Sequence, residues 1–263
     1  MSSTLSRLPA PRRVIEGLMS TLQTEPIPVD DYVREGFSPL SNLAHGWELY
    51  TALLLTPAEE RTMVREPTDA VPESLATRVG KLRVIVVPYI GCFQSGDAVC
   101  SAKPSGETHS AVWIEADSRT NLVLACRELD AHDTGFELLA SVAQLVIPKL
   151  TSGERSTYTK MIEEELHQRT PGEIDKEALV AKEAYLESRR RGGRTSQLEK
   201  YVEASLVSTL AEYMHGLWHD VQIRVGLEHL PVPQLHRRMT ALAEIFPPNA
   251  GYELFDRELH SSS

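Results

Sequence analysis

The segment from Gln197 to Val225 constrains the fold more than any other part of the chain, because it predicts a long helix without a solvated side. At about 100° per residue, one side is an apolar stripe of the kind that packs on a core. That stripe consists of Leu198, Val202, Leu206, Leu210, Met214, Leu217 and Val221. The opposite side has mostly small or uncharged residues and neither lysine nor arginine: Tyr201, Ala204, Ser205, Ser208, Ala211, Glu212, His215, Gly216, His219 and Gln222. A solvated face normally carries long charged side chains, so we expect a central helix that is buried on both sides.

Three polar residues on that second side, Glu212, His215 and His219, follow one another at spacings of three and four. Side chains at these spacings are neighbours on one face of a helix. Two imidazoles four residues apart are a metal-ligand spacing, and Glu-x-x-His is the helical element of carboxylate-bridged two-metal bundles. A second Glu-x-x-His is formed by Glu164 and His167. These five residues are therefore candidate ligands for one or two ions of zinc or another divalent metal.

A structural explanation of the same residues stays open. The run Glu163-Glu164-Glu165 carries like charges and would ordinarily lie in solvent. The pair His215 and His219 lacks the internal glutamate of the metalloprotease helix motif. Hydrogen-bonded structural histidines would account for both residues without any ligand.

The middle of the chain predicts a small sheet. Lys81 to Ile90 is rich in β-branched residues and apolar enough to be covered on both faces, with Pro88 at an edge or a strand end. Ala111 to Ala116 and Asn121 to Cys126 are two further strands, joined by the polar residues 117–120 as a hairpin loop. Residues 93–109 are polar and contain glycine and proline, which predicts a long loop.

The rest of the chain carries helical signals. We expect a helix that begins at Pro57 with the capping box Thr56 to Glu59, and an apolar helix from Thr134 to Leu150 capped by Asp133 or Thr134. Further helices are expected at 156–167, from a capping box at Thr170 to about Arg190, and at 233–245. The predicted fold class is α+β, with a small, mostly antiparallel sheet at about residues 81–126 followed by a helical C-terminal half with a long central helix. Residues 1–45 form a partly ordered arm, 46–258 one domain and 259–263 a disordered tail in this prediction.

Charge and composition exclude several classes of partner. The formal net charge of −10 would repel a phosphate backbone, and the one dense basic run, Arg189-Arg190-Arg191 with Arg194, suits a helix C-terminus. We therefore expect no nucleic-acid partner. No segment approaches the ~18 apolar residues that a bilayer span needs, so we expect no membrane contact. The beginning of the chain has no apolar signal segment and the chain has an odd count of three cysteines, which favours a cytoplasmic location.

Two weaker motifs have simpler explanations. Asp133-Thr134-Gly135 spells the aspartic-protease triplet, but the second copy that the chemistry requires is absent, and a helix cap explains it. Cys92 or Cys100 would need a nearby base to act as a nucleophile, and His109 is the nearest histidine in the sequence.

The enzyme motifs do not reinforce one another. The sequence favours a soluble intracellular globular protein that acts through binding, as a degenerate or non-catalytic enzyme relative, with a protein partner or by self-association. A metal-dependent, peptidase-like hydrolase with ligands on the helix around residues 212–219 is the first alternative. An oligomeric structural protein that uses the small residues Ala204, Ser208 and Ala211 as a subunit contact is the second.

Overall fold

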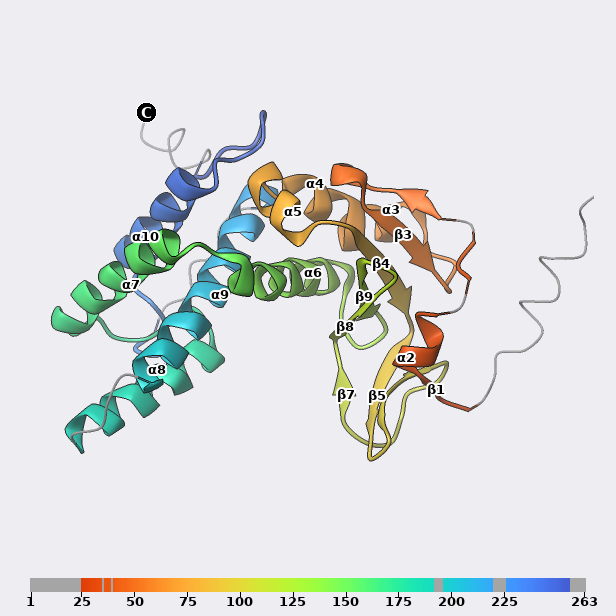
Figure 1. Cartoon of the computed structure of the whole chain (residues 1–263), viewed down its shortest axis with the longest axis horizontal. Coiled ribbons are helices and arrows are strands. Elements are labelled where there is room, and N and C mark those ends of the chain that lie inside the picture. The colour runs from red at the N-terminus through yellow and green to blue at the C-terminus, as the bar shows by residue number, and fades with distance from the viewer. Residues whose placement is uncertain (1–24, 35, 39, 192–195, 220–225, 256–263) are drawn as a thin grey trace, which may run out of the picture.

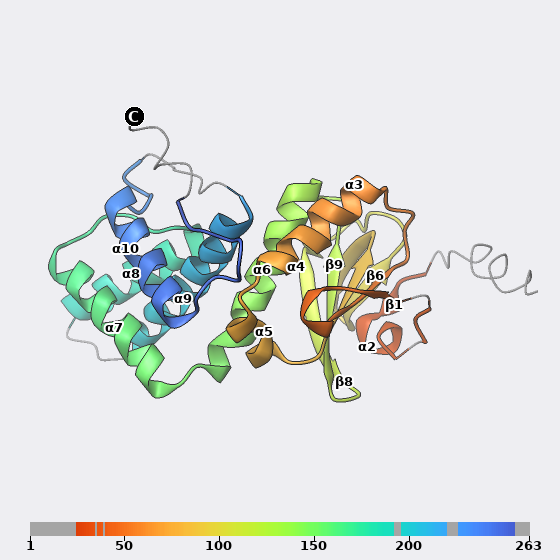
Figure 2. The same ribbon diagram turned by 90° about the horizontal axis from the view of Figure 1, so that it is seen from above.

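The computed structural model describes residues 25–34, 36–38, 40–191, 196–219 and 226–255. They form a lobe built on β-sheets and a lobe of helices, with helix α6 (Ala131–Val146) lying between the two (Figure 1, Figure 2). The predicted α+β class, with a helical C-terminal half, is confirmed.

The main sheet is mixed and is covered on both faces. In spatial order its strands are β2 (Ser41–Asn42), β3 (Glu48–Thr51), β4 (Leu82–Val87), β9 (Arg119–Ala125) and β8 (Ala111–Ala116). The three central strands are parallel, and the two outer strands run antiparallel to their neighbours. Alternate residues of β4 point to opposite faces, so Val84 and Val86 join the core under the helices while Ile85 and Val87 join a second core. The prediction of a strand buried on both faces is confirmed.

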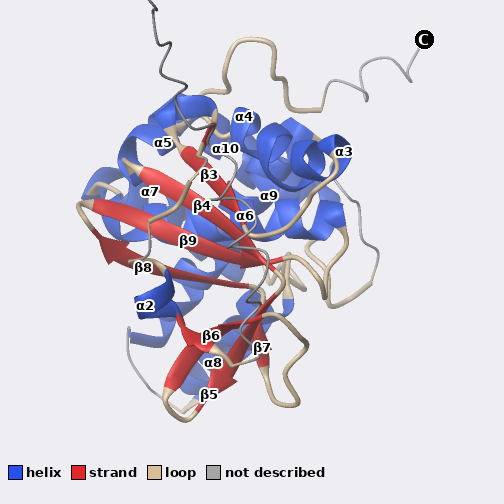
Figure 3. Ribbon diagram, turned by 90° about the vertical axis from the view of Figure 1, so that its right-hand side faces the viewer, coloured by secondary structure: helices blue, strands red, loops and turns tan. Residues whose placement is uncertain are grey.

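A second, antiparallel sheet lies beyond β8 in Figure 3 and shares the second core with the other face of the main sheet. Its strands are, in order, β1 (Ile27–Pro28), β6 (Gly96–Cys100), β5 (Tyr89–Phe93) and β7 (Thr108–His109), and the short helix α2 (Val29–Tyr32) packs beside them. Pro88 separates β4 from β5, as expected of a residue that cannot donate to a ladder. The expectation of a loop at 93–109 was wrong, because β6 and β7 lie within it. β6 has only three buried apolar residues, Ala98 to Cys100, and β7 has only two residues, so the strand signal of each is short, and pairing with β5 supplies the order.

Four short segments pack on the helical face of the main sheet. They are α3 (Pro57–Glu60), a π-helical turn (Arg61–Arg65), α4 (Glu66–Ala70) and α5 (Glu73–Val79). The capping box at Thr56 is confirmed, since its hydroxyl accepts the Glu59 N–H at 3.2 Å and Glu59 accepts the Thr56 N–H at 2.7 Å. The cap of α6 is Asp130 rather than the expected Asp133 or Thr134. Its carboxylate accepts the Asp133 N–H at 2.8 Å, so the helix starts one turn earlier.

The helical lobe consists of α7 (Ser152–His167), α8 (Lys176–Arg190), α9 (Ser196–Trp218) and α10 (Val232–Ile245). The long helix α9 is central and is buried on both sides, as predicted, with Tyr201, Thr209 and Tyr213 fully covered. The expected end of this helix at Val225 lies outside the described residues. The capping box expected at Thr170 was wrong: α8 begins after Asp175, which accepts the Ala178 N–H at 2.8 Å.

A buried ion-pair network holds the helical lobe together. The Arg238 guanidinium lies 2.6 Å from Glu165 and 2.8 Å from Glu173, and all three side chains are almost completely buried. The ammonium of Lys182 donates to the carbonyls of Thr170 and Gly172 at 2.9 and 2.7 Å. Each charge thus has the partners that a buried charge requires.

The segment at 27–51 belongs to both sheets, since β1 pairs with β6 and β3 pairs with β4. Residues 1–24 and 256–263, which include most of the predicted arm and all of the predicted tail, lie outside the described ranges. None of the helices in the described part of the chain combines the length and the apolarity needed to cross a bilayer.

Candidate ligand pocket and the histidine pair beside it

A cavity of about 300 Å³ lies between α6, the start of α8 and α9. Its volume is at the lower end of the range for small-molecule sites, which favour the junctions between lobes. Apolar side chains form much of its wall: Phe136, Ala140, Ile174, Val207, Ala211, Leu230 and Leu235. The two lobes therefore enclose a partly apolar space where they meet.

The polar part of the wall is acidic. Five carboxylates line the cavity, from Glu137, Glu173, Asp175, Glu177 and Glu212, and no lysine or arginine is among the described residues around it. Glu173 is paired with Arg238, and Asp175 caps α8. The other three are the carboxylates that a ligand would meet.

Glu212 is the most informative of these residues. It is only 9% exposed, and its Oε1 has no hydrogen-bond partner among the described residues. It lies 3.6 Å from Nδ1 of His215, which also lacks a hydrogen bond there. A buried polar atom left without a hydrogen bond costs about 1–3 kcal/mol, so a donor that met this atom after a small rotation of the side chain toward the cavity would stabilise it.

Burial also affects the second carboxylate. It raises the pKa of Glu137, and no other cause contributes to the shift. Glu137 has no ion-pair partner within the described ranges. A cation in the cavity would supply the missing charge for Glu137 and Glu212 alike.

A chain of polar groups leads from the pocket to the surface. Glu212 lies beside His215, and Nε2 of His215 is 3.1 Å from Nε2 of His132 at the start of α6. His215 is buried, whereas the His132 side chain is one-third exposed. The ring of His132 stacks on Trp218, with centroids 5.0 Å apart and planes at 19°. These side chains form a line of polar groups from the pocket toward solvent, in which His215 and His132 are within hydrogen-bond distance and Glu212 and His215 lie 3.6 Å apart.

Close packing fixes the outer end of this line of polar groups. A Cβ at Gly135 would come within 2.5 Å of the Trp218 ring and 2.7 Å of the Thr62 carbonyl oxygen. Thr62 belongs to the π-helical turn, a type of distortion that is frequent at functional sites. Glycine at this position therefore lets α6, α9 and the π-helical turn approach one another.

The residues predicted from the sequence as metal ligands divide into two places. Glu212 and His215 lie together beside the pocket, and the ring of His219, which is exposed, lies 5.0 Å from that of His132. Glu164 instead forms an ion pair with Arg237 on the surface. His167 lines a separate cavity of about 1000 Å³ between α7 and α8. A metal held by these residues stays a prediction.

That larger cavity has a different character. It carries Arg169, Lys182, Arg189 and Arg190 in its wall. None of its described lining residues has a buried side-chain atom without a hydrogen bond. The smaller acidic pocket thus has the stronger indication of a ligand.

The cysteine considered as a nucleophile lies beside the expected base, but its chemistry is unfavourable. Partial burial and the charges of Asp97 and Glu107 raise the pKa of the Cys92 thiol. An activated cysteine needs the opposite shift. Cys100 is buried in β6, so neither cysteine combines exposure with the electropositive surroundings of an activated nucleophile.

Comparisons with known proteins do not place the chain in a family: no family model, no curated protein and no solved structure matches it.

Glu212 and His215 were candidate metal ligands on sequence grounds, whereas Glu137 and His132 were not among the candidate ligands. One feature of the sequence pointed to Glu137: it is an acidic residue within an apolar helix, between Phe136 and Leu138. Nothing in the local sequence indicates that His132, 83 positions earlier, contacts His215. That contact depends on how α6 packs against α9.

Proposed function

We propose that this protein binds a small organic cation, of the aliphatic amine class, in the pocket between α6, α8 and α9. The observation that carries the proposal is the Oε1 atom of Glu212, a residue of the acidic wall, which is buried without a hydrogen-bond partner among the described residues. An ammonium group donates up to three hydrogen bonds and would satisfy this atom.

The mixed wall favours an organic cation over a bare metal ion. Carboxylates would bind the ammonium group, while the apolar side chains and the face of Phe136 would contact a hydrocarbon chain. A metal ion instead needs ligand atoms that lie close together. Within the described chain, three such side chains gather at Cys92, Asp97 and His109 and at Asp130, His132 and Asp133, and neither group lines this pocket.

The remaining properties of the chain agree with a cationic ligand. The formal net charge of −10 attracts cations over distances of about a Debye length. Two of the small residues on the second side of α9, Ser208 and Ala211, are buried and line this pocket, whereas Ala204 is half-buried outside it. The three described cysteines are free thiols, which supports a reducing, cytoplasmic location.

Isothermal titration calorimetry of the full-length protein with putrescine and spermidine tests the proposal. The key variant is Glu212→Gln, and the matched control is Glu203→Gln, which removes the same charge from an exposed position of the same helix. We expect one binding site, with affinity reduced about tenfold or more in Glu212→Gln, since a hydrogen bond to a charged group is worth ~1.5–3 kcal/mol. The control should bind like the wild type.

Two results would overturn the proposal. An equal loss of amine affinity in Glu212→Gln and Glu203→Gln would mean that binding depends only on the net charge of the protein. Absence of amine binding, together with zinc uptake that is lost in a His215→Ala, His219→Ala double variant, would favour the metal-dependent alternative instead.

A further inference from the structure

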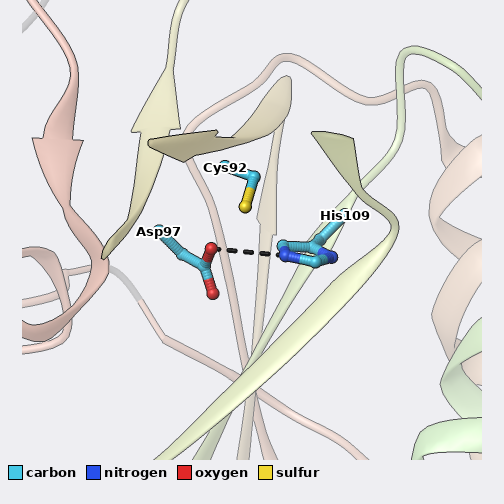
Figure 4. Close-up of side chains that lie close together, drawn as sticks. All are labelled: Cys92, Asp97 and His109. Atoms are coloured by element: carbon cyan, nitrogen blue, oxygen red, sulfur yellow. Dashed lines mark ion pairs between the residues drawn. The ribbon is translucent and has the colours of Figure 1, made fainter. Parts of the chain in front are cut away.

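We propose that Cys92, Asp97 and His109 form a Zn²⁺ site on the second sheet, separate from the amine pocket. The three side chains come from β5, β6 and β7 and point toward one another (Figure 4). One ligand atom from each residue lies within 4.8 Å of the other two. Nε2 of His109 is 3.3 Å from Oδ1 of Asp97.

The strand register creates this arrangement. Cys92 of β5 is directly opposite Asp97 of β6, and His109 of β7 is opposite Ile90, two residues from Cys92. Because residues opposite each other and residues two apart share a face of a sheet, all three side chains lie on one face. The backbone thus fixes the positions of the three ligands before any ion arrives.

The ligand types favour zinc. Zn²⁺ binds thiolate sulfur at ~2.3 Å, and imidazole nitrogen and carboxylate oxygen at ~2.0–2.2 Å, in tetrahedral geometry. Those bond lengths place ligand atoms roughly 3.3–3.7 Å apart, which small side-chain rotations would reach here. Zn²⁺ would also displace the thiol proton of Cys92, since coordination requires the thiolate.

The site has three protein ligands and an accessible fourth position. Cys92 is exposed, and the side chains of His109 and Asp97 are 45% and 35% exposed. Water would complete the tetrahedron, as in zinc sites that keep an exchangeable position. The ion would join three strands, one of them only two residues long, and so stabilise the outer end of the sheet.

Titration of the chelator-free, full-length protein with ZnCl₂ tests this inference, with calorimetry for affinity and Co²⁺ absorption for ligand identity. The variant is Cys92→Ser, and the matched control is Cys100→Ser, which alters a buried cysteine of the adjacent strand. We expect one zinc ion per chain, weakened about tenfold or more in Cys92→Ser and unchanged in Cys100→Ser. The near-ultraviolet thiolate-to-Co²⁺ band should be present in the wild type and the control, and absent from Cys92→Ser.

The outcomes separate this site from the pocket. His109→Ala should weaken zinc binding as Cys92→Ser does, whereas Glu212→Gln should leave it unchanged. Zinc binding that persists at full affinity in both Cys92→Ser and His109→Ala would overturn the proposal, and so would a wild-type protein that binds no zinc.

Discussion

Nε2 of His215 in α9 lies 3.1 Å from Nε2 of His132 in α6, although 83 positions of sequence separate the two residues. At this distance one ring nitrogen donates a hydrogen bond and the other accepts it. The contact joins the helical lobe to the sheet lobe and continues the polar chain that starts at Glu212 in the pocket.

Removal of His132 should therefore destabilise the protein. In His132→Ala the buried Nε2 of His215 loses its partner, and Nδ1 already lacks a hydrogen bond within the described residues. We expect a loss of about 1–3 kcal/mol in the free energy of unfolding, measured by urea denaturation. His132→Gln, which keeps a donor and an acceptor, should recover part of this loss, and equal stability of His132→Ala and wild type would count against the contact.

The adjacent arginines of α10 should differ strongly in their contribution to stability. Arg238→Met leaves the buried carboxylates of Glu165 and Glu173 without their main partner. We expect it to cost about 3–5 kcal/mol in the free energy of unfolding. Arg237→Met, which breaks a surface ion pair with Glu164, should cost less than ~1 kcal/mol. Similar values for the two variants would contradict the buried network.

Gly135→Ala tests the close approach of α6 to α9 and the π-helical turn. The added methyl group would overlap the Trp218 ring and the Thr62 carbonyl, so we expect a loss of about 1–3 kcal/mol in thermal or urea unfolding. Gly153→Ala is the control, because the only atom near a Cβ there is 3.9 Å away, and it should be neutral or slightly stabilising. A neutral Gly135→Ala variant would show that the helices are farther apart than described.

Glu137 should make stability depend on pH. Burial raises its pKa above the ordinary 4.5, so the folded state keeps a proton that the unfolded state has released. The free energy of unfolding should then fall as pH rises from about 4.5 through the raised pKa, and should level off above it. Urea denaturation at several pH values should show Glu137→Gln gaining stability relative to wild type across that window. A constant difference between the two proteins would contradict the shift.

The burial of α9 on both sides could be predicted from the residues of its second side. That side has no lysine or arginine, and a helix face without long charged side chains is normally covered by other parts of the protein. The capping box at Thr56 was predictable for a similar reason, since Glu59 and Thr56 satisfy each other within four residues.

Features that arise from packing were beyond local reasoning. Arg238 follows Leu235 by three residues and precedes Leu242 by four, so it lies on the buried face of α10. Its partners Glu165 and Glu173 are 73 and 65 positions away in the sequence, which no local pattern indicates. β6 and β7 are ordered by pairing with β5 rather than by their own composition. The pocket likewise exists only where α6, α8 and α9 meet, so Glu137 and Glu212 could not be assigned to one wall from the sequence.

A crystal structure of the full-length protein grown with putrescine would test the central claim most directly. The account predicts a diamine in the cavity between α6, α8 and α9, with one nitrogen about 2.7–3.2 Å from Oε1 of Glu212 and the carbon chain against Phe136. Diamine found only at surface carboxylates, or an interior in which Glu212 pairs with another side chain of the protein, would contradict it.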